Sequence, residues 1–281
     1  MSSDSPIENL RREQGAAIAM PSEPRISVVV PTKNESRNLP FVFERMPADV
    51  HEIIVVDGYS KDDTREVALA LDDRVRVVEQ SRPGKGNALA HGFREVTGDV
   101  IVMLDADCSA DAAEIPAFVE ALRAGADFAK GSRYAAGGGS EDLTRLRSTG
   151  NRVLTTTVNT LFGTSYTDLC YGYNAFWTHC LPHISIDCDG FEVETMMNIR
   201  IAKARLSVTE VPSYEWERRY GHSNLRVWRD GWRVQRTIMR EFATRKRAEG
   251  VLPERRAHHR GGSVDGAFER RAALRCATSG D

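Results

Sequence analysis

The 281-residue sequence predicts an α/β fold in which helices cover both faces of a mostly parallel central sheet. Short apolar runs rich in β-branched residues alternate with amphipathic segments of helical length, which is the pattern of repeated strand–helix units. Runs such as Ile53 to Val56 and Val100 to Leu104 are apolar at every position, which is typical of strands buried on both faces. Polar residues follow several runs directly, and sheets of this kind bind ligands at the carboxyl ends of their strands.

The first half of the chain shows the most regular alternation. Pro31 ends the first apolar run, and Pro40 fits the first turn of the helix that follows. The next helix can be capped by Asp62 or Asp63. The expected strands are 26–30, 52–56, 75–78, 100–104 and 127–130, and the expected helices are 36–46, 62–71, 84–96 and 111–124.

The alternation loosens after residue 135, where a glycine-rich loop begins. Trp228 and Trp232 are four residues apart and therefore share one face of a basic helix. We expect these tryptophans to pack on the core; the alternative is a helix that lies against anionic lipid. The expected strands are 171–177 and 206–211, and the expected helices are 143–161, 191–204 and 224–247.

Composition excludes several classes of protein. A net charge of −2 argues against nucleic acid as the main partner. No apolar run approaches the ~20 residues of a membrane-spanning helix, and the N-terminal segment lacks the apolar core of a signal peptide. Five cysteines without a close pair indicate reduced thiols rather than a zinc site. We therefore expect a cytoplasmic protein, with peripheral contact at the inner face of a membrane left open.

The stretch "VIVMLDADCSADAAE" places two carboxylates directly after a buried strand. Asp105 and Asp107 are separated by one residue, so both project from one turn and repel each other when charged. A divalent cation removes this repulsion, and Mg²⁺ or Mn²⁺ commonly joins one or two carboxylates to the phosphates of a substrate. The pattern predicts a metal that holds a diphosphate; the alternative is a helix cap beside a solvated acid.

Other strand ends carry groups that suit a nucleotide. "VVVPTKNESRNL" has no glycine, which excludes the glycine-rich turn of dinucleotide-binding folds, and its Thr32 and Glu35 can instead meet a base or ribose. Asp57 can accept a hydrogen bond from a base or a sugar hydroxyl, although it also fits an ordinary turn. Lys85 lies between two glycines at a helix start in "RPGKGNALAHG", and this arrangement suits a phosphate.

Nine motifs in order give the chain a family resemblance. "VVVPTKNES", "IIVVDGYSKDDT", "GKGNAL" and "VIVMLDADCSAD" resemble the nucleotide-sugar half of family 2 glycosyltransferases, which have the GT-A fold. "KGSRY", "NRVLTTTVNTLFG", "TDLCYGYNAF", "DGFEVETMM" and "VPSYEWERRYGHSNL" are similar to motifs of dolichol-phosphate mannose synthases and bacterial polyprenyl-phosphate glycosyltransferases. The resemblance covers about residues 25–240. It implies a Rossmann-like nucleotide-sugar half at 25–134 and an acceptor half at 135–245. Composition predicts a flexible polar arm at 1–24 and a disordered tail rich in Arg, Gly, Ser and His at 246–281.

The resemblance also implies roles for individual residues. Asp105 would touch the nucleotide sugar and Asp107 would bind Mg²⁺ or Mn²⁺. Arginines in this family gather the donor diphosphate and the acceptor phosphate. The residues matching these arginines are Arg133, Arg147 and Arg218, and those matching the base and ribose site are Pro31, Thr32, Glu35 and Asp57.

The activity implied by the resemblance is an inverting transfer of a hexose. The donor is a nucleotide-diphosphate sugar, and the acceptor is a polyprenyl phosphate or a hydroxyl of a glycan or small molecule. A hydroxyl needs a general base, and we favour Glu192 slightly over Glu194, although either can be an ordinary acid at a helix start. The rivals are a nucleotidyltransferase that makes the nucleotide sugar and a non-catalytic nucleotide-sugar binding protein.

Three positions depart from the family pattern. Gly58 stands where the family commonly has a second acid, and Ser109 stands where it often has a glutamine beside the metal. Residues 223–225 read Ser-Asn-Leu where the polyprenyl-phosphate members usually read Ser-Lys-Leu. The missing lysine weakens the implication that the acceptor is a phosphate.

Overall fold

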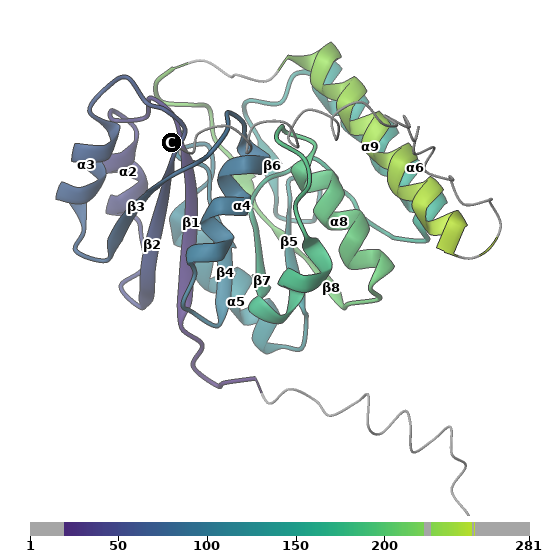
Figure 1. The fold of residues 1–281 in the computed structure, drawn as a ribbon, viewed down its shortest axis with the longest axis horizontal. Coiled ribbons are helices and arrows are strands. Elements are labelled where there is room, and N and C mark those ends of the chain that lie inside the picture. Colours follow the sequence, from purple (N-terminus) through teal and green to yellow (C-terminus); the bar gives the residue numbers. More distant parts are fainter. Residues whose placement is uncertain (1–19, 222–225, 249, 251–281) are drawn as a thin grey trace, which may run out of the picture.

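A central sheet of seven strands organises the computed structural model, which describes residues 20–221, 226–248 and 250 (Figure 1). The strand order is β3-β2-β1-β4-β7-β5-β8, and β7 runs antiparallel to its neighbours β4 and β5. The other pairings in this sheet are parallel, so the expected fold is confirmed. The strands are β1 (Ile26–Thr32), β2 (Val50–Asp57), β3 (Val75–Glu79), β4 (Val100–Met103), β5 (Phe128–Ser132), β7 (Asn174–Trp177) and β8 (Val208–Pro212).

Helices cover both faces of the sheet because successive residues of each buried strand point to opposite sides. Val28 and Val30 pack into one apolar cluster with α2, α3 and α5, whereas Val29 packs into a second cluster with α4 and α8. Continuous apolar strands therefore bury both of their faces, as the sequence predicts. The helices are α2 (Leu39–Glu44), α3 (Thr64–Leu71), α4 (Lys85–Glu95), α5 (Ile115–Arg123), α6 (Arg145–Phe162), α7 (Leu181–Ile184), α8 (Val193–Lys203) and α9 (Val227–Ala248).

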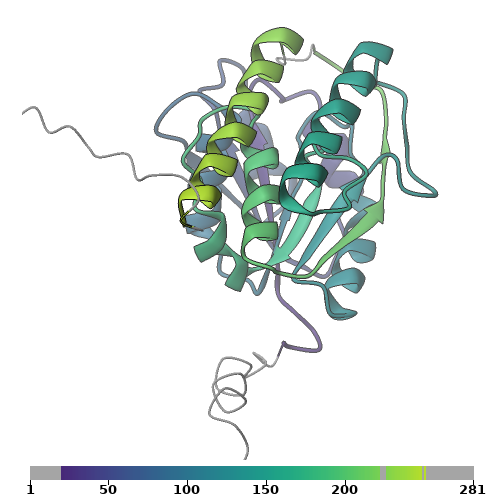
Figure 2. The same ribbon diagram turned by 90° about the vertical axis from the view of Figure 1, so that its right-hand side faces the viewer.

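Helices α6 and α9 form an outer layer beyond the β5–β8 end of the sheet. Figure 2, in which both helices face the viewer, shows that they lie side by side. A third apolar cluster joins them to α8, with Val158 from α6, Ile199 from α8, and Val234 and Ile238 from α9. This layer places two long helices beside the carboxyl ends of the central strands.

Several local features differ from the expected elements. Helix α2 begins at Leu39 rather than near Ser36. The Ser36 hydroxyl donates to Asp62 Oδ2 at 2.7 Å, and this bond holds residues 36–38 in a turn before the helix. Two short parallel strands that the sequence did not predict, β6 (Gly139–Ser140) and β9 (Tyr214–Glu215), form a second sheet. Short strands of this kind lack the apolar run that would reveal them.

The expectation that the tryptophans of α9 pack on the core is wrong. Trp228 is 82% exposed and Trp232 is 72% exposed, while Val234 and Ile238 fill the buried side of the helix. Helix α9 continues to Ala248, three residues into the segment expected to be disordered. The rest of that segment and most of the expected N-terminal arm lie outside the described residues. No helix in the described part of the chain is long and apolar enough to cross a bilayer.

Candidate active site

The two acids after β4 lie at the carboxyl edge of the sheet. The Leu104 N–H still donates to the Val29 carbonyl at 3.1 Å, so the strand pairing ends immediately before Asp105. Asp107 Oδ1 then accepts from the Ser109 N–H at 3.0 Å, and Cys108 between them takes a left-handed backbone with φ of 64°. This turn fixes the Asp107 carboxylate, and Asp105 lies directly after the last strand pairing.

Lysine 85 joins Asp105 to a second acid from the other half of the chain. Lys85 Nζ lies 2.6 Å from Asp105 Oδ1 and 2.8 Å from Glu194 Oε1. Gly172 makes this contact sterically feasible, because a Cβ at that position would lie 2.8 Å from Lys85 Nζ. Burial alone would lower the pKa of Lys85, but Asp105 and Glu194 outweigh burial and raise it.

Arginine 218 pairs with the second acid of the motif. Arg218 Nη1 lies 2.7 Å from Asp107 Oδ2, and Arg218 Nε is buried without a hydrogen-bond partner among the described residues. A buried donor without a partner costs free energy, which a ligand oxygen can recover. Each acid of the Asp-x-Asp pair therefore holds a cationic side chain.

A nearby glutamate titrates unusually. Burial raises the pKa of Glu35 to about 7; Asp107 and Asp105 add to this shift, whereas Asn38 and Arg218 oppose it. Glu35 follows β1, and its backbone N–H donates to Thr64 Oγ1 at 2.9 Å. The carboxyl edge therefore gathers several acids whose mutual repulsion is only partly cancelled.

The residues expected to hold a base and ribose meet across two neighbouring strands. Thr32 of β1 pairs in register with Asp57 of β2, and Pro31 pairs with Val56 one step earlier. Asp57 is buried and accepts from the Ser60 N–H at 3.3 Å. The Thr32 hydroxyl donates to the Val30 carbonyl at 2.8 Å. The structure thus brings Thr32, Asp57 and Glu35 to one edge.

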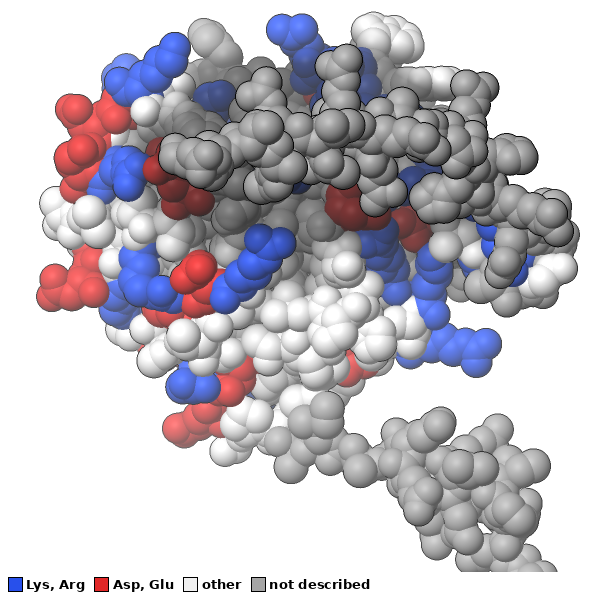
Figure 3. Space-filling view, viewed as in Figure 1, with Lys and Arg blue, Asp and Glu red and all other residues white. Residues whose placement is uncertain are grey.

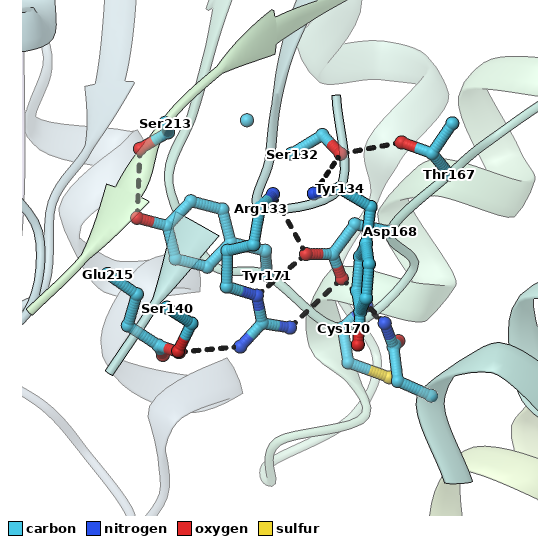
Figure 4. A network of polar contacts seen from close by, with 12 residues as sticks. Ser132, Arg133, Tyr134, Ser140, Thr167, Asp168, Cys170, Tyr171, Ser213 and Glu215 are labelled. Atoms are coloured by element: carbon cyan, nitrogen blue, oxygen red, sulfur yellow. Dashed lines mark hydrogen bonds and ion pairs between the residues drawn. The ribbon is translucent and has the colours of Figure 1, made fainter. Parts of the chain in front are cut away.

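Arginine 133 lies in a saturated cluster (Figure 4). Its Nε and Nη2 donate to the two oxygens of Asp168 at 2.7 and 3.0 Å, and its Nη1 donates to Glu215 Oε2 at 2.9 Å. Asn151 also donates to Asp168 at 2.9 Å, and the guanidinium lies over the Tyr171 ring. The Arg133 side chain is only 4% exposed. These contacts join β5 to β9 and to the segment before β7, and both Arg133 and Glu215 also line the pocket described next.

A pocket of about 180 Å³ connects Asp105 and Glu194 to the outer helices. Lys85, Asp105, Glu194 and Arg218 line its polar end. Apolar side chains from α6 and α9 and from the segments just before α6 and α8 line the rest of the wall, among them Phe191, Leu143, Leu146, Leu154, Val227 and Val234. The pocket therefore combines a charged floor with an apolar wall.

The remaining predicted residues take different places relative to this pocket. Arg147 lines it and binds Asp142 through Nη1 at 2.9 Å. Glu194 also lines it, whereas Glu192 does not, and Glu192 Oε2 is buried without a hydrogen-bond partner in the described structure. Of the two glutamates, Glu194 is therefore the one that faces the pocket. Residues 222–225, including the Ser-Asn-Leu departure, lie outside the described residues.

The acid pair suits a cation that the substrate helps to bind. Across residues 20–221, 226–248 and 250, no group of three or more His, Cys, Asp or Glu side chains could hold a metal by itself. Mg²⁺ needs only one or two carboxylates when substrate phosphates complete its coordination. Asp105 and Asp107 meet that requirement, and Ser109, which lies in the pocket wall, would add only a weak ligand.

Sequence reasoning assigned no role to three residues of the site. Asp168 and Gly172 both occur in the "TDLCYGYNAF" motif, so the family resemblance of that motif could have identified them as site residues. Glu215 lies 82 residues from its partner Arg133, and no local pattern connects the two. Both carboxylates hold Arg133, and Gly172 lets Lys85 approach the acids.

The fold and the strand-end site define a class of enzyme, the glycosyltransferases with the GT-A fold. The chain belongs to glycosyl transferase family 2, whose sequence profile matches residues 27–181. It is 35% identical over 232 residues to a polyprenol monophosphomannose synthase of Mycolicibacterium smegmatis, covering 76% of this chain and 87% of that protein. It is also 31% identical over 215 residues to the glycosyltransferase AglJ of Haloferax volcanii, covering 75% of this chain and 70% of that protein.

Solved structures support the fold assignment. A glucosyl-3-phosphoglycerate synthase from Mycobacterium tuberculosis, in complex with phosphoglyceric acid, superposes with a TM-score of 0.64 at 22% identity. The match covers 91% of this chain and 88% of that one. The same enzyme has been crystallised with Mn²⁺ and uridine diphosphate, and with Mg²⁺ and uridine diphosphate. At this identity the likeness concerns the fold alone.

Proposed function

We propose that this glycosyltransferase is metal-dependent and inverting, and that it transfers a hexose from a nucleotide-diphosphate sugar to a polyprenyl phosphate. The observation that carries this proposal is the pocket in which Lys85, Asp105, Glu194 and Arg218 face an apolar wall from α6 and α9. The polar end suits a diphosphate and an acceptor phosphate, and the apolar wall suits a hydrocarbon chain. The relative that is 35% identical is named for a polyprenol acceptor.

The donor would lie along the carboxyl edge of the sheet. Thr32, Glu35 and Asp57 lie where the base and ribose would bind, and Pro31 shapes the end of β1 beside them. Asp105 and Asp107 would hold Mg²⁺ or Mn²⁺ together with the donor diphosphate, and the bound cation would stabilise the charge of the leaving nucleoside diphosphate. Arg218 and Lys85 are then free to donate to phosphate oxygens in place of the acids they hold.

A phosphate acceptor simplifies the chemistry that the protein must supply. A polyprenyl phosphate is already an anion near neutral pH, so one of its oxygens can attack the anomeric carbon without a general base. The protein must orient two anions and offset their repulsion. Arg147 and Arg218 provide positive charge at the pocket, while Arg133 holds the surrounding segments in place.

One observation favours a hydroxyl acceptor as a second candidate. Glu194 lies at the polar end of the pocket, and burial raises its pKa while Lys85 opposes the shift. A carboxylate in that place could accept a proton from a sugar hydroxyl. If this candidate holds, replacing Glu194 with Gln removes the acidic limb of the pH–rate profile; with a phosphate acceptor that limb remains.

The proposal is tested by a transfer assay with purified protein. UDP-, GDP- and dTDP-hexoses are offered with a polyprenyl phosphate, with and without Mn²⁺, and glycolipid formation is measured. We expect one donor to give product only with the cation, and Asp107→Asn to lower kcat/KM by about 1000-fold. Asp111→Asn is the matched control, because Asp111 lies four residues further on and pairs with Arg45 outside this pocket. No product with any donor, or full activity of Asp107→Asn, would refute the proposal.

A further inference from the structure

The outward face of α6 and α9 combines exposed apolar side chains with positive charge. We propose that this face, defined by Leu146, Val153, Trp228, Trp232 and Met239, docks on the surface of an anionic lipid bilayer. The inference rests on the proposed function only for the identity of the lipid acceptor, because docking itself requires neither donor nor acceptor.

An aromatic stripe on α9 is the first observation. Trp228 and Trp232 are the two most exposed large apolar side chains of the described residues, at 82% and 72%. Met239 lies seven residues beyond Trp232 on the same side of the helix, and it is about half exposed. Tryptophan has an apolar body and a polar N–H, and it is enriched where proteins meet the membrane–water interface.

Helix α6 extends the stripe sideways. Leu146 and Val153 are separated by two helical turns, so both lie on one side of α6, and each is more than half exposed. The outer side of α6 between and beyond them carries mainly threonine and glycine, and the whole helix contains no acidic residue. Helices α6 and α9 lie side by side (Figure 2), so these exposed apolar side chains belong to neighbouring helices of one outer layer.

The charge on these two helices is the second observation. Helix α6 carries three arginines, and α9 carries seven Lys or Arg residues against two acids, although the whole chain has a net charge of −2. Both acids of α9 are buried and paired: Asp230 binds Arg229, and Glu241 binds Arg200 and Lys203. Figure 3 shows Lys and Arg side chains on both sides of the molecule: on the left they alternate with Asp and Glu, and further ones lie at the lower right, on the side where α8 and α9 lie in Figure 1.

This charge pattern selects lipid over a second copy of the chain. Two such faces packed together by twofold symmetry would oppose the positive charge of one with that of the other. An anionic leaflet instead attracts basic residues near its surface, at about 1 kcal/mol for each Lys or Arg. Exposed tryptophans between arginines therefore match a negatively charged bilayer surface.

The position of the face adds a functional reason for docking. Leu146 belongs to the face and also lines the pocket, and Val227 lines the pocket next to Trp228. The apolar wall of the pocket therefore continues onto the docking face. A docked protein would present its pocket to the bilayer, so a polyprenyl chain could enter without passing through water.

Vesicle co-sedimentation tests the inference without any substrate. Wild-type protein is mixed with vesicles of phosphatidylcholine alone or with 30% phosphatidylglycerol. We expect binding only to the anionic vesicles, weakened by 0.5 M salt, and at least tenfold weaker binding by Trp228→Ser/Trp232→Ser. Leu69→Ser is the control, because Leu69 is exposed on α3, away from the face. Wild-type protein that ignores anionic vesicles, or a double variant that binds as tightly as wild type, would overturn the inference.

Two further readouts keep the result interpretable. Because both tryptophans are exposed, the double variant should keep the wild-type melting temperature, which shows that it is folded. The salt dependence of vesicle binding by wild-type protein tests docking without any variant. Sedimentation of a wild-type dimer that the double variant loses, with no vesicle binding, would assign the face to a second copy instead. A chain that binds vesicles but transfers no sugar would refute the proposed function and leave the docking inference standing.

Discussion

Two clusters of ion pairs lie near the same pocket and use the same chemistry in opposite ways. In the Arg133 cluster, one guanidinium binds Asp168 and Glu215, and every acid is buried (Figure 4). In the strand-end cluster, Lys85 and Arg218 hold Asp105 and Asp107 at the edge of the sheet. The first cluster connects segments of the fold, and the second faces the place where a donor would bind.

The difference lies in burial and in how completely the polar groups are satisfied. The Asp168 side chain is fully buried, whereas that of Asp105 is 35% exposed; the second acids, Asp107 at 8% and Glu215 at 9%, are equally buried. Three Arg133 nitrogens have acceptors, but Arg218 Nε has none in the described structure. A saturated buried pair resists exchange because a lone buried charge is costly. A partly exposed pair can release its cation to a ligand.

The largest expected effect comes from breaking the buried cluster. Arg133→Met would leave Asp168 and Glu215 buried without their cation, and we expect a loss of about 3–5 kcal/mol in the free energy of unfolding. Urea denaturation measures this loss. Arg147→Met is the control, because the Arg147–Asp142 pair is partly exposed, and its removal should cost at most about 1 kcal/mol. Equal stability of the two variants would contradict the distinction between the clusters.

A smaller effect, on activity rather than stability, is expected in the strand-end cluster. Arg218→Lys keeps a positive charge beside Asp107 but loses the planar group that can bind two oxygens. We expect kcat/KM to fall by about 10- to 100-fold, as for the loss of a charged hydrogen bond, with the urea midpoint unchanged. Steady-state kinetics and denaturation of the same preparation check both parts. A stability loss as large as that of Arg133→Met would place Arg218 in the structural class.

The smallest effects concern pH and compare the two ends of the central strands: Glu35 follows the carboxyl end of β1, and Glu52 lies near the amino end of β2. Burial raises the pKa of Glu35 to about 7, so folding favours its protonated form, and this residue costs stability as pH rises from about 4.5 to 7. Glu52 has its pKa lowered to about 2, because hydrogen bonds from Ser27, Thr97 and Arg76 outweigh burial. Its contribution is present above about pH 4.5 and is lost as pH falls towards 2.

Melting temperatures of Glu35→Gln and Glu52→Gln across pH 3–8 measure these opposite signs. Relative to wild type, Glu35→Gln should gain stability as pH rises through 4.5 to 7. Glu52→Gln should be destabilised at neutral pH and should approach wild type in acid. If the melting temperatures of both variants depended on pH in the same way, Glu35 and Glu52 would not have opposite pKa shifts, and the prediction would be wrong.

The sequence predicted the carboxyl edge well because its signals are local. Apolar strands followed at once by Asp57 or Asp105 specify both the strand and the side of the sheet. The antiparallel direction of β7 was not predictable, because a short apolar run has the same composition in either direction. The partners of Arg133 lie 35 and 82 residues away, so only the fold reveals them. The four-residue spacing of Trp228 and Trp232 fits a buried and an exposed stripe equally, and only packing decides.

The most direct measurement of the central claim is a crystal structure with Mn²⁺ and the nucleoside diphosphate of the accepted donor, using the anomalous signal of manganese. We predict a single strong anomalous peak about 2.1 Å from an oxygen of Asp107. The cation at this peak should also contact the diphosphate, and Arg218 should have moved from Asp107 to a phosphate oxygen. A nucleotide bound with no peak beside Asp105 and Asp107, or with both acids still paired to Lys85 and Arg218, would contradict the claim.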